Sequence, residues 1–195
     1  MVIKTGYEAF VMAMERVERR LKEVSAALDR AGIPYAVVGG NAVAAWIATI
    51  DPAATRTTKD VDLLVRRGDL ERISATMTEL GFRREILRDL VLFLDPEEPS
   101  RRSGVHLVWA GEKVRPSYLH ATPEVHEAVR DASPFALLSL PALVRMKLTS
   151  LRDIDRVHIA DLLETGLIDD GVRAALPADL RERLATIEKT LESGE

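Results

Sequence analysis

The chain has 195 residues, of which 47% are hydrophobic and 30% charged, as in a folded protein with one domain or a core and a small appendage. It contains no cysteine, which excludes disulfides, thiolate zinc sites and cysteine nucleophiles. The formal net charge of −4 excludes a general nucleic-acid coat but not a local basic groove. Without a visible signal peptide or membrane-spanning run, we expect a cytoplasmic protein with no membrane partner.

Apolar residues near the N-terminus recur at alternating spacings of four and three, which predicts an amphipathic helix over residues 7–30. This stripe suits either a coiled-coil seam or packing on the protein's own sheet. We expect the sheet, because the stripe spans at most three heptads. The next predicted elements are a strand over Tyr35–Val38, a Gly-Gly turn, a helix of small residues over Asn41–Ile50 and a strand over Asp60–Val65.

The rest of the chain divides into a strand-rich part and a helical part. The expected elements are a helix over Asp69–Leu80, strands over Phe82–Arg88, Leu90–Leu94 and Gly104–Ala110, a largely irregular stretch over 111–133, and helices over Pro141–Arg152, Ile154–Thr165, Asp169–Leu176 and Ala178–Ser193. The sequence therefore predicts an α/β core over residues 1–133 and a helical C-terminal unit over residues 134–195.

Two acidic residues share one face of a predicted strand. Alternate side chains of a strand point the same way, so Asp60 and Asp62 lie about 7 Å apart on one face. Paired carboxylates at this spacing suit a hard divalent cation such as Mg²⁺, which completes its shell with water and substrate phosphates. The alternative is a pair of solvated carboxylates at a sheet edge.

The Gly39-Gly40 pair follows a predicted strand and precedes a predicted helix. Backbone N–H groups at such a helix start can approach an anion, and the helix dipole favours its negative charge. The alternative is a tight turn with no ligand. A phosphate cradle followed by a strand with paired acids is a more specific pattern than either feature alone.

This combination resembles the nucleotidyltransferase superfamily, which includes the DNA polymerase β group, antibiotic nucleotidyltransferases and AbiEii/MenT-type toxins. The resemblance rests on Val37–Val43, Arg56–Leu64 and Val144–Leu163, the last of which is similar to the helical segment of the toxin-like branch. It implies an α/β (α+β) fold with a mixed sheet flanked by helices and a C-terminal helical unit. It also implies that the glycines hold a triphosphate, that Asp60 and Asp62 bind Mg²⁺, and that a third carboxylate on a later strand completes the site.

The strand expected to carry this third carboxylate has His106 instead. An imidazole can act as a general base near neutral pH, but it is a poor ligand for Mg²⁺. Asp95, at the end of the preceding strand, is a second candidate for the third acid. Asn41, Arg56 and Lys59 flank the proposed site and are candidate nucleotide contacts, while charges in such loops also form ordinary solvated surface.

Helical geometry places two charged residues on apolar faces. Lys147 falls within an arc of leucine and valine side chains, and Asp161 lies on an apolar arc of the next helix. Charges on such faces are costly unless paired, so one interpretation is an ion pair between the two, or a lysine that reaches water. The resemblance implies that Lys147 contacts nucleotide phosphates, with Asp161 close by.

We interpret the sequence as a Mg²⁺- or Mn²⁺-dependent enzyme that transfers a nucleoside monophosphate from an NTP to a hydroxyl group of RNA or a small molecule. The expected catalytic residues are Asp60, Asp62, His106 and Lys147. The alternatives are a catalytically weakened relative that binds nucleotide or a protein partner without turnover, and a toxin-like enzyme that acts on RNA.

Overall fold

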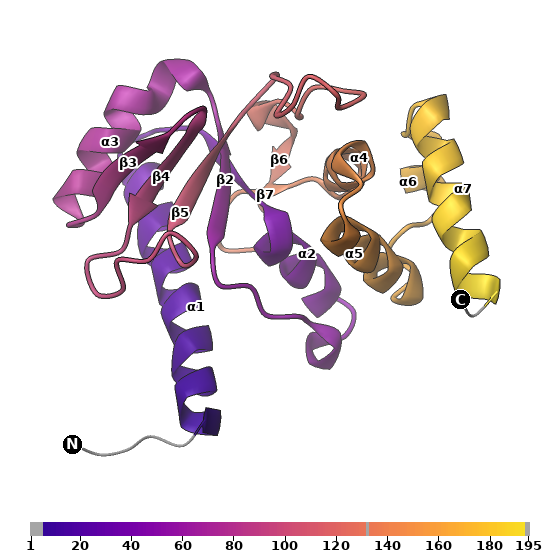
Figure 1. Ribbon diagram of the computed structural model, residues 1–195, viewed down its shortest axis with the longest axis horizontal. Coiled ribbons are helices and arrows are strands. Elements are labelled where there is room, and N and C mark those ends of the chain that lie inside the picture. Colours follow the sequence, from indigo (N-terminus) through magenta and orange to yellow (C-terminus); the bar gives the residue numbers. More distant parts are fainter. Residues whose placement is uncertain (1–5, 132, 194–195) are drawn as a thin grey trace.

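The computed structural model describes residues 6–131 and 133–193, which form a seven-stranded mixed sheet flanked by helices (Figure 1). The strands are β1 (Tyr35–Val38), β2 (Val61–Val65), β3 (Arg83–Leu87), β4 (Leu90–Leu94), β5 (Val105–Trp109), β6 (Ala128–Val129) and β7 (Leu137–Leu138). The helices are α1 (Gly6–Arg30), α2 (Gly39–Ala48), α3 (Leu70–Glu79), α4 (Leu140–Ser150), α5 (Asp153–Glu164), α6 (Asp170–Ala174) and α7 (Ala178–Ser193). Short 3-10 helices cover Pro52–Ala54, Arg67–Asp69 and Val125–Glu127.

The strand order brings three chain segments together at one end of the sheet. Across the sheet the order is β3-β4-β5-β2-β1-β7-β6, with β2 parallel to β5 and antiparallel to β1. In this register Asp62 lies opposite Val38 on β1 and opposite His106 on β5. The end of β1 and the starts of β2 and β5 therefore meet, and side chains from all three can reach one point.

Helices cover both faces of this sheet. α1 contacts α3 and β2, and α3 contacts β3, whereas α2 contacts β1, β2, α4 and α5. Residues of β1 are buried along its whole length, because the strand is covered on both faces. α2 thus connects the sheet to the C-terminal helices, which stand to one side of it in Figure 1.

The long helix α1 is anchored by only part of its apolar stripe. Leu21, Val24 and Leu28 are buried in the core, which confirms the expected packing of this part on the sheet. Phe10 and Met14 are exposed, and the first half of α1 projects from the body of the protein (Figure 1). The amphipathic pattern predicts the helix well, but it does not show where the partner surface ends.

Several element boundaries differ from the expected ones. β6 and β7 were not predicted, and β7 pairs with β1, so the sheet extends a few residues beyond the boundary expected at residue 133. α2 begins at Gly39, not Asn41, and β2 begins at Val61, so Asp60 lies just before the strand. Across residues 6–131 and 133–193, no helix combines the length and the apolar character that crossing a membrane requires.

Candidate active site

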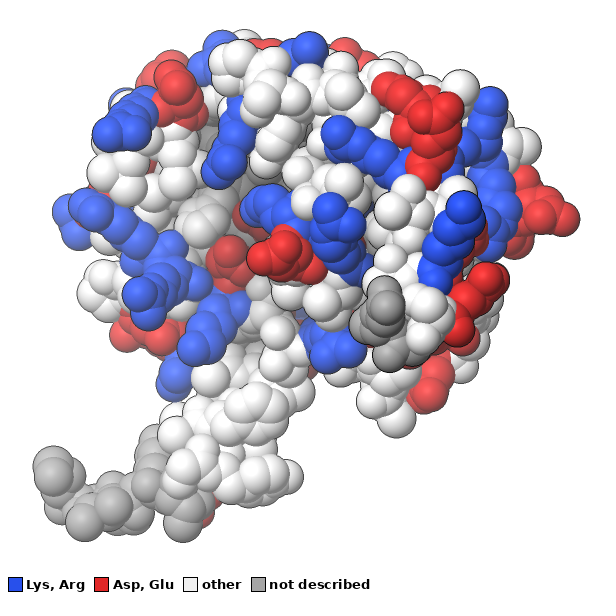
Figure 2. Space-filling view, turned by 45° about the vertical axis from the view of Figure 1, so that its right-hand side comes forward, with Lys and Arg blue, Asp and Glu red and all other residues white. Residues whose placement is uncertain are grey.

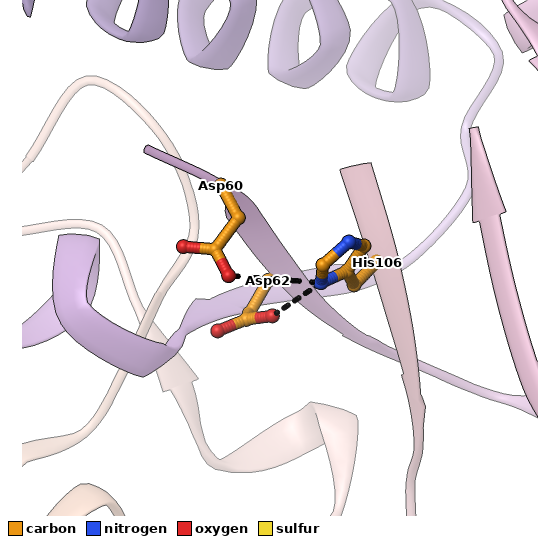
Figure 3. A group of neighbouring side chains, drawn as sticks. All are labelled: Asp60, Asp62 and His106. Atoms are coloured by element: carbon orange, nitrogen blue, oxygen red, sulfur yellow. Dashed lines mark ion pairs between the residues drawn. The ribbon is translucent and has the colours of Figure 1, made fainter. Parts of the chain in front are cut away.

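Three potential metal ligands converge where β2 and β5 begin. One ligand atom from each of Asp60, Asp62 and His106 lies within 4.8 Å of the other two. His106 Nδ1 is 3.7 Å from Asp60 Oδ2 and 3.6 Å from Asp62 Oδ1, and all three side chains are partly exposed (Figure 3). The paired strands thus place two carboxylates and one imidazole around a single point.

The orientation of the His106 ring is set by the backbone. Its Nε2 lies 2.8 Å from the carbonyl oxygen of Arg101, which can only accept a hydrogen bond. The neutral ring therefore carries its proton on Nε2 and directs the Nδ1 lone pair at the two aspartates. These donors fit a divalent cation, and the nitrogen donor suits Mn²⁺ better than Mg²⁺.

The electrostatics of this point favour a positive charge. Interaction with the Asp62 carboxylate raises the pKa of His106 above its ordinary value, and the effect of burial, which lowers it, is smaller. The Arg101 carbonyl and Asp60 raise the pKa further. The group can therefore stabilise either a proton on His106 or a cation held between the same atoms.

Neighbouring polar groups hold Asp60 in place. The Thr58 hydroxyl donates to Asp60 Oδ1 at 2.6 Å, and the Asn41 side-chain amide donates to the Asp60 backbone oxygen at 2.7 Å. Asn41 therefore joins the first turn of α2 to the segment that carries the acids. Thr58 was not singled out from the sequence, because a threonine in a polar loop has no distinguishing pattern.

Gly39 allows the start of α2 to approach Asp62 closely. Its φ is +69°, and a Cβ atom there would lie 2.1 Å from Asp62 Oδ2, so any other residue would be both strained and in collision. No described side chain caps the N-terminus of α2, and its first turn holds no acidic residue. The first N–H groups of α2 thus remain available to an anion beside Asp62.

A pocket adjoins these residues and opens to solvent, with an empty volume of about 670 Å³ that includes part of that solvent. Its polar wall includes Gly39, Asp62, Lys147, Arg152 and Asp155, and its apolar wall includes Val108, Val114, Tyr118 and Met146. A space-filling view shows a hollow on one face of the molecule, with acidic side chains beside it and basic side chains on both sides (Figure 2). One side of the pocket is the candidate metal site. The other, the cationic wall, consists of Lys147 on α4 and Arg152 at the start of α5.

Lys147 forms an ion pair with Asp155 and not with Asp161, its partner in one interpretation of the sequence. Its Nζ lies 3.0 Å from Asp155 Oδ1, and Asp161 instead pairs with Arg56 through contacts of 2.6 and 2.9 Å. The ion pair between Lys147 and Asp161, which is one interpretation of the sequence, is therefore not formed. The reason is the turn at Leu151, whose left-handed backbone (φ 47°) starts α5 so that Asp155, in its first turn, faces back towards Lys147.

Two other residues considered from the sequence are not among the three potential metal ligands. Asp95 is buried and accepts from Arg20 Nε at 2.7 Å, so it is engaged with α1 and is not a third acid of this group. Lys59 precedes Asp60 and is exposed, while its backbone oxygen accepts from Arg20 at 3.4 Å. Among the described residues, His106 is therefore the third potential metal ligand beside Asp60 and Asp62.

His158 on α5 makes the helical unit sensitive to acid. Its ring is buried near Lys147, Asp155, Asp161 and Arg152, and its Nδ1 has no hydrogen-bond partner among the described residues. Burial, reinforced by the positive charge of Lys147, lowers the pKa of His158 from 6.5 to about 4. The folded chain therefore holds this imidazole neutral over a range in which the unfolded chain protonates it.

The stabilisation from neutral His158 is complete above about pH 6.5 and is lost as the pH falls towards 4. When the pH falls from 7 to about 4, we expect the free energy of unfolding of the wild type to drop by about 3 kcal/mol more than that of His158→Gln. Urea unfolding at a series of pH values measures both losses. Equal losses in the two proteins would contradict the prediction.

The strand order, the glycine turn and the paired acids define the class of protein: this is the nucleotidyltransferase fold, as predicted from the sequence. The sequence profile of a family described as uncharacterised nucleotidyltransferase matches residues 2–127, and the chain belongs to this family. Membership supports nucleotidyl transfer as the general activity. A search of curated protein sequences finds no match for the chain.

Solved structures show the same fold. The solution structure of the antibiotic-resistance factor ANT(2'')-Ia has a TM-score of 0.58 and 20% identity, covering 92% of this chain and 98% of that chain. The crystal structure of ANT(2'')-Ia in complex with adenylyl-2''-tobramycin has a TM-score of 0.50 and 18% identity, covering 91% and 99%. At these identities the likeness establishes the architecture, and the predicted fold class is confirmed.

Proposed function

We propose that the protein transfers a nucleoside monophosphate from an NTP to a hydroxyl acceptor, with a divalent cation held by Asp60 and Asp62. The observation that carries this proposal is the convergence of Asp60, Asp62 and His106 beside the Gly39 turn, next to a pocket lined by Lys147. An NTP substrate also agrees with the cytoplasmic location that we propose from the sequence.

Each residue has a task in this proposal. Asp60 and Asp62 hold the cation, with His106 at the third position, and the bound cation would neutralise phosphate charge. The N–H groups of Gly39 and Gly40 bind phosphate oxygens at the start of α2, and Lys147 binds them from α4. Catalysis then consists of positioning and charge neutralisation, with no covalent bond to the protein.

Three residues near the acids, Arg56, Lys59 and Asn41, have auxiliary roles in this proposal. Arg56 pairs with Asp161 on α5, and its side chain remains 61% exposed. The guanidinium can therefore contact nucleotide without breaking this ion pair. Exposed Lys59 stands next to Asp60 and is a second candidate for steering nucleotide. Asn41 acts through the Asp60 backbone, which makes it a positioning residue in this proposal.

The acceptor is either RNA or a small molecule. A small molecule is favoured by the structural neighbour ANT(2'')-Ia, which was crystallised in complex with adenylyl-2''-tobramycin. Basic side chains on both sides of the hollow in Figure 2 favour an anionic acceptor such as RNA. A second candidate function is nucleotide or protein binding without turnover, which is favoured by the imidazole at the third position, because it weakens Mg²⁺ binding.

Incubation with each labelled NTP tests the proposal directly. We expect label to appear on total RNA or on one of a panel of hydroxyl-bearing small molecules, in the presence of Mg²⁺ or Mn²⁺ and not of EDTA. Gel electrophoresis and thin-layer chromatography follow the label. Nucleotide binding with no transfer to any acceptor would favour the second candidate function, and absence of binding would exclude both.

A further inference from the structure

Asp155 is a buried anion that holds two cations on the wall of the pocket. It is 0% exposed, and its oxygens accept from Lys147 Nζ at 3.0 Å and from Arg152 Nε at 2.7 Å. A second guanidinium nitrogen of Arg152 lies 3.1 Å away, and Ser150 Oγ donates at 2.6 Å. Burial alone would raise the pKa of Asp155, but these hydrogen bonds and the two cations outweigh it and bring the pKa far below its usual range.

The charges of this group do not cancel. One carboxylate faces one ammonium and one guanidinium, which leaves one positive charge at the pocket wall. The Lys147 side chain is 5% exposed and the Arg152 side chain 56% exposed, and both line the same pocket as Gly39 and Asp62. Asp155 thus holds both cations in place, while Arg152 remains accessible to a ligand in the pocket.

Capping of α5 does not account for the second cation. The start of a helix can be capped by a neutral side chain, and Ser150 and the Arg152 backbone N–H already contact Asp155. Burying Lys147 requires only one countercharge, which Asp155 supplies. Arg152 adds a half-exposed guanidinium that faces the pocket, which suits recognition of a phosphate group.

We propose that Asp155 is a positioning residue that fixes Lys147 and Arg152 as a two-cation phosphate clamp. The clamp faces phosphate groups that the cation at Asp60 and Asp62 does not neutralise. It therefore makes the site selective for nucleoside triphosphates over the corresponding monophosphates. This inference rests on the proposed function, since it assigns the specificity of the same pocket.

The test compares the affinities of one triphosphate and its monophosphate. The NTP that raises the melting temperature most is chosen, and isothermal titration in Mn²⁺ uses its non-hydrolysable analogue and the matching NMP. Arg152→Met should weaken binding of the triphosphate about 10- to 100-fold and that of the monophosphate about twofold or less. Arg156→Met, on α5 four residues further along and outside the pocket lining, serves as the matched control and should change neither affinity.

Asp155→Asn should also lower the triphosphate-to-monophosphate affinity ratio, because buried Lys147 loses its countercharge and Arg152 its anchor. A purely structural role would reduce both affinities together and leave the ratio unchanged. An unchanged ratio in Arg152→Met, with tight triphosphate binding by the wild type, overturns the clamp and leaves the proposed function intact. A wild type that binds no nucleotide overturns both.

Discussion

Replacing Asp60 and Asp62 together with asparagine should abolish the metal-dependent rise in melting temperature that an NTP produces. A ligand at a hundredfold excess over its dissociation constant stabilises the native state by about 2.7 kcal/mol, or about 5–10 °C for a chain of this size. Asparagine keeps the shape of both side chains but removes the two negative charges that hold the cation. Differential scanning fluorimetry with NTP and Mg²⁺ or Mn²⁺, each alone and together, measures the shift.

The matched control replaces two exposed acids elsewhere, Asp89→Asn and Asp170→Asn, neither of which lines the pocket. This variant should retain the full shift, which separates the loss of two specific ligands from the general loss of negative charge. The same double substitution of Asp60 and Asp62 should reduce transfer of label to background. A full shift in the Asp60/Asp62 variant would remove the metal assignment.

His106→Asp should raise Mg²⁺-dependent transfer by about tenfold or more, because it gives the cation a third carboxylate in place of an imidazole. The wild type should accordingly prefer Mn²⁺, which tolerates nitrogen ligands better than Mg²⁺ does. Initial rates in each cation, with cation affinities from calorimetry, test both statements. Without cation, the variant should be less stable than the wild type, since three carboxylates then repel one another.

Other outcomes for His106→Asp are equally informative. A lower rate in both cations, with cation affinity unchanged, would assign His106 the role of general base. Rates and cation preference equal to those of the wild type would make His106 a bystander. His126→Asp, at an exposed position of the 3-10 helix Val125–Glu127 and outside the pocket lining, is the matched control and should leave both quantities unchanged.

The elements of the core could be predicted because each has a clear period. Alternation places Asp62 and His106 on strands that turn out to be parallel neighbours, and the apolar stripe of residues 7–30 gives α1. β6 and β7 could not be predicted, because two-residue strands have no alternation. The pairing of β7 with β1, and of β6 with β7, depends on where the chain returns after a long loop, which is set by tertiary packing.

The parts of the candidate site that depend on local backbone geometry could be predicted, and the parts that depend on tertiary packing could not. Strand spacing and the glycine turn bring Asp62 to Gly39, as the sequence indicates. Helical angles correctly give Lys147 an inward position but do not show which acid it meets. Lys147 meets Asp155 because the chain makes a left-handed turn at Leu151. Leucine rarely adopts positive φ, so the sequence does not indicate this turn.

The hydrogen bond from His106 Nε2–H to the Arg101 carbonyl limits what the ring can do. One nitrogen is committed as a donor, so a neutral ring has a single lone pair, at Nδ1, to offer. That lone pair can coordinate a cation or accept the proton of an attacking hydroxyl, and it cannot do both in one turnover. If the imidazole is a ligand, the proton of the acceptor must leave to another group, such as an aspartate oxygen, water or a phosphate oxygen. Metal affinity and proton abstraction at this residue are therefore competing uses of one electron pair.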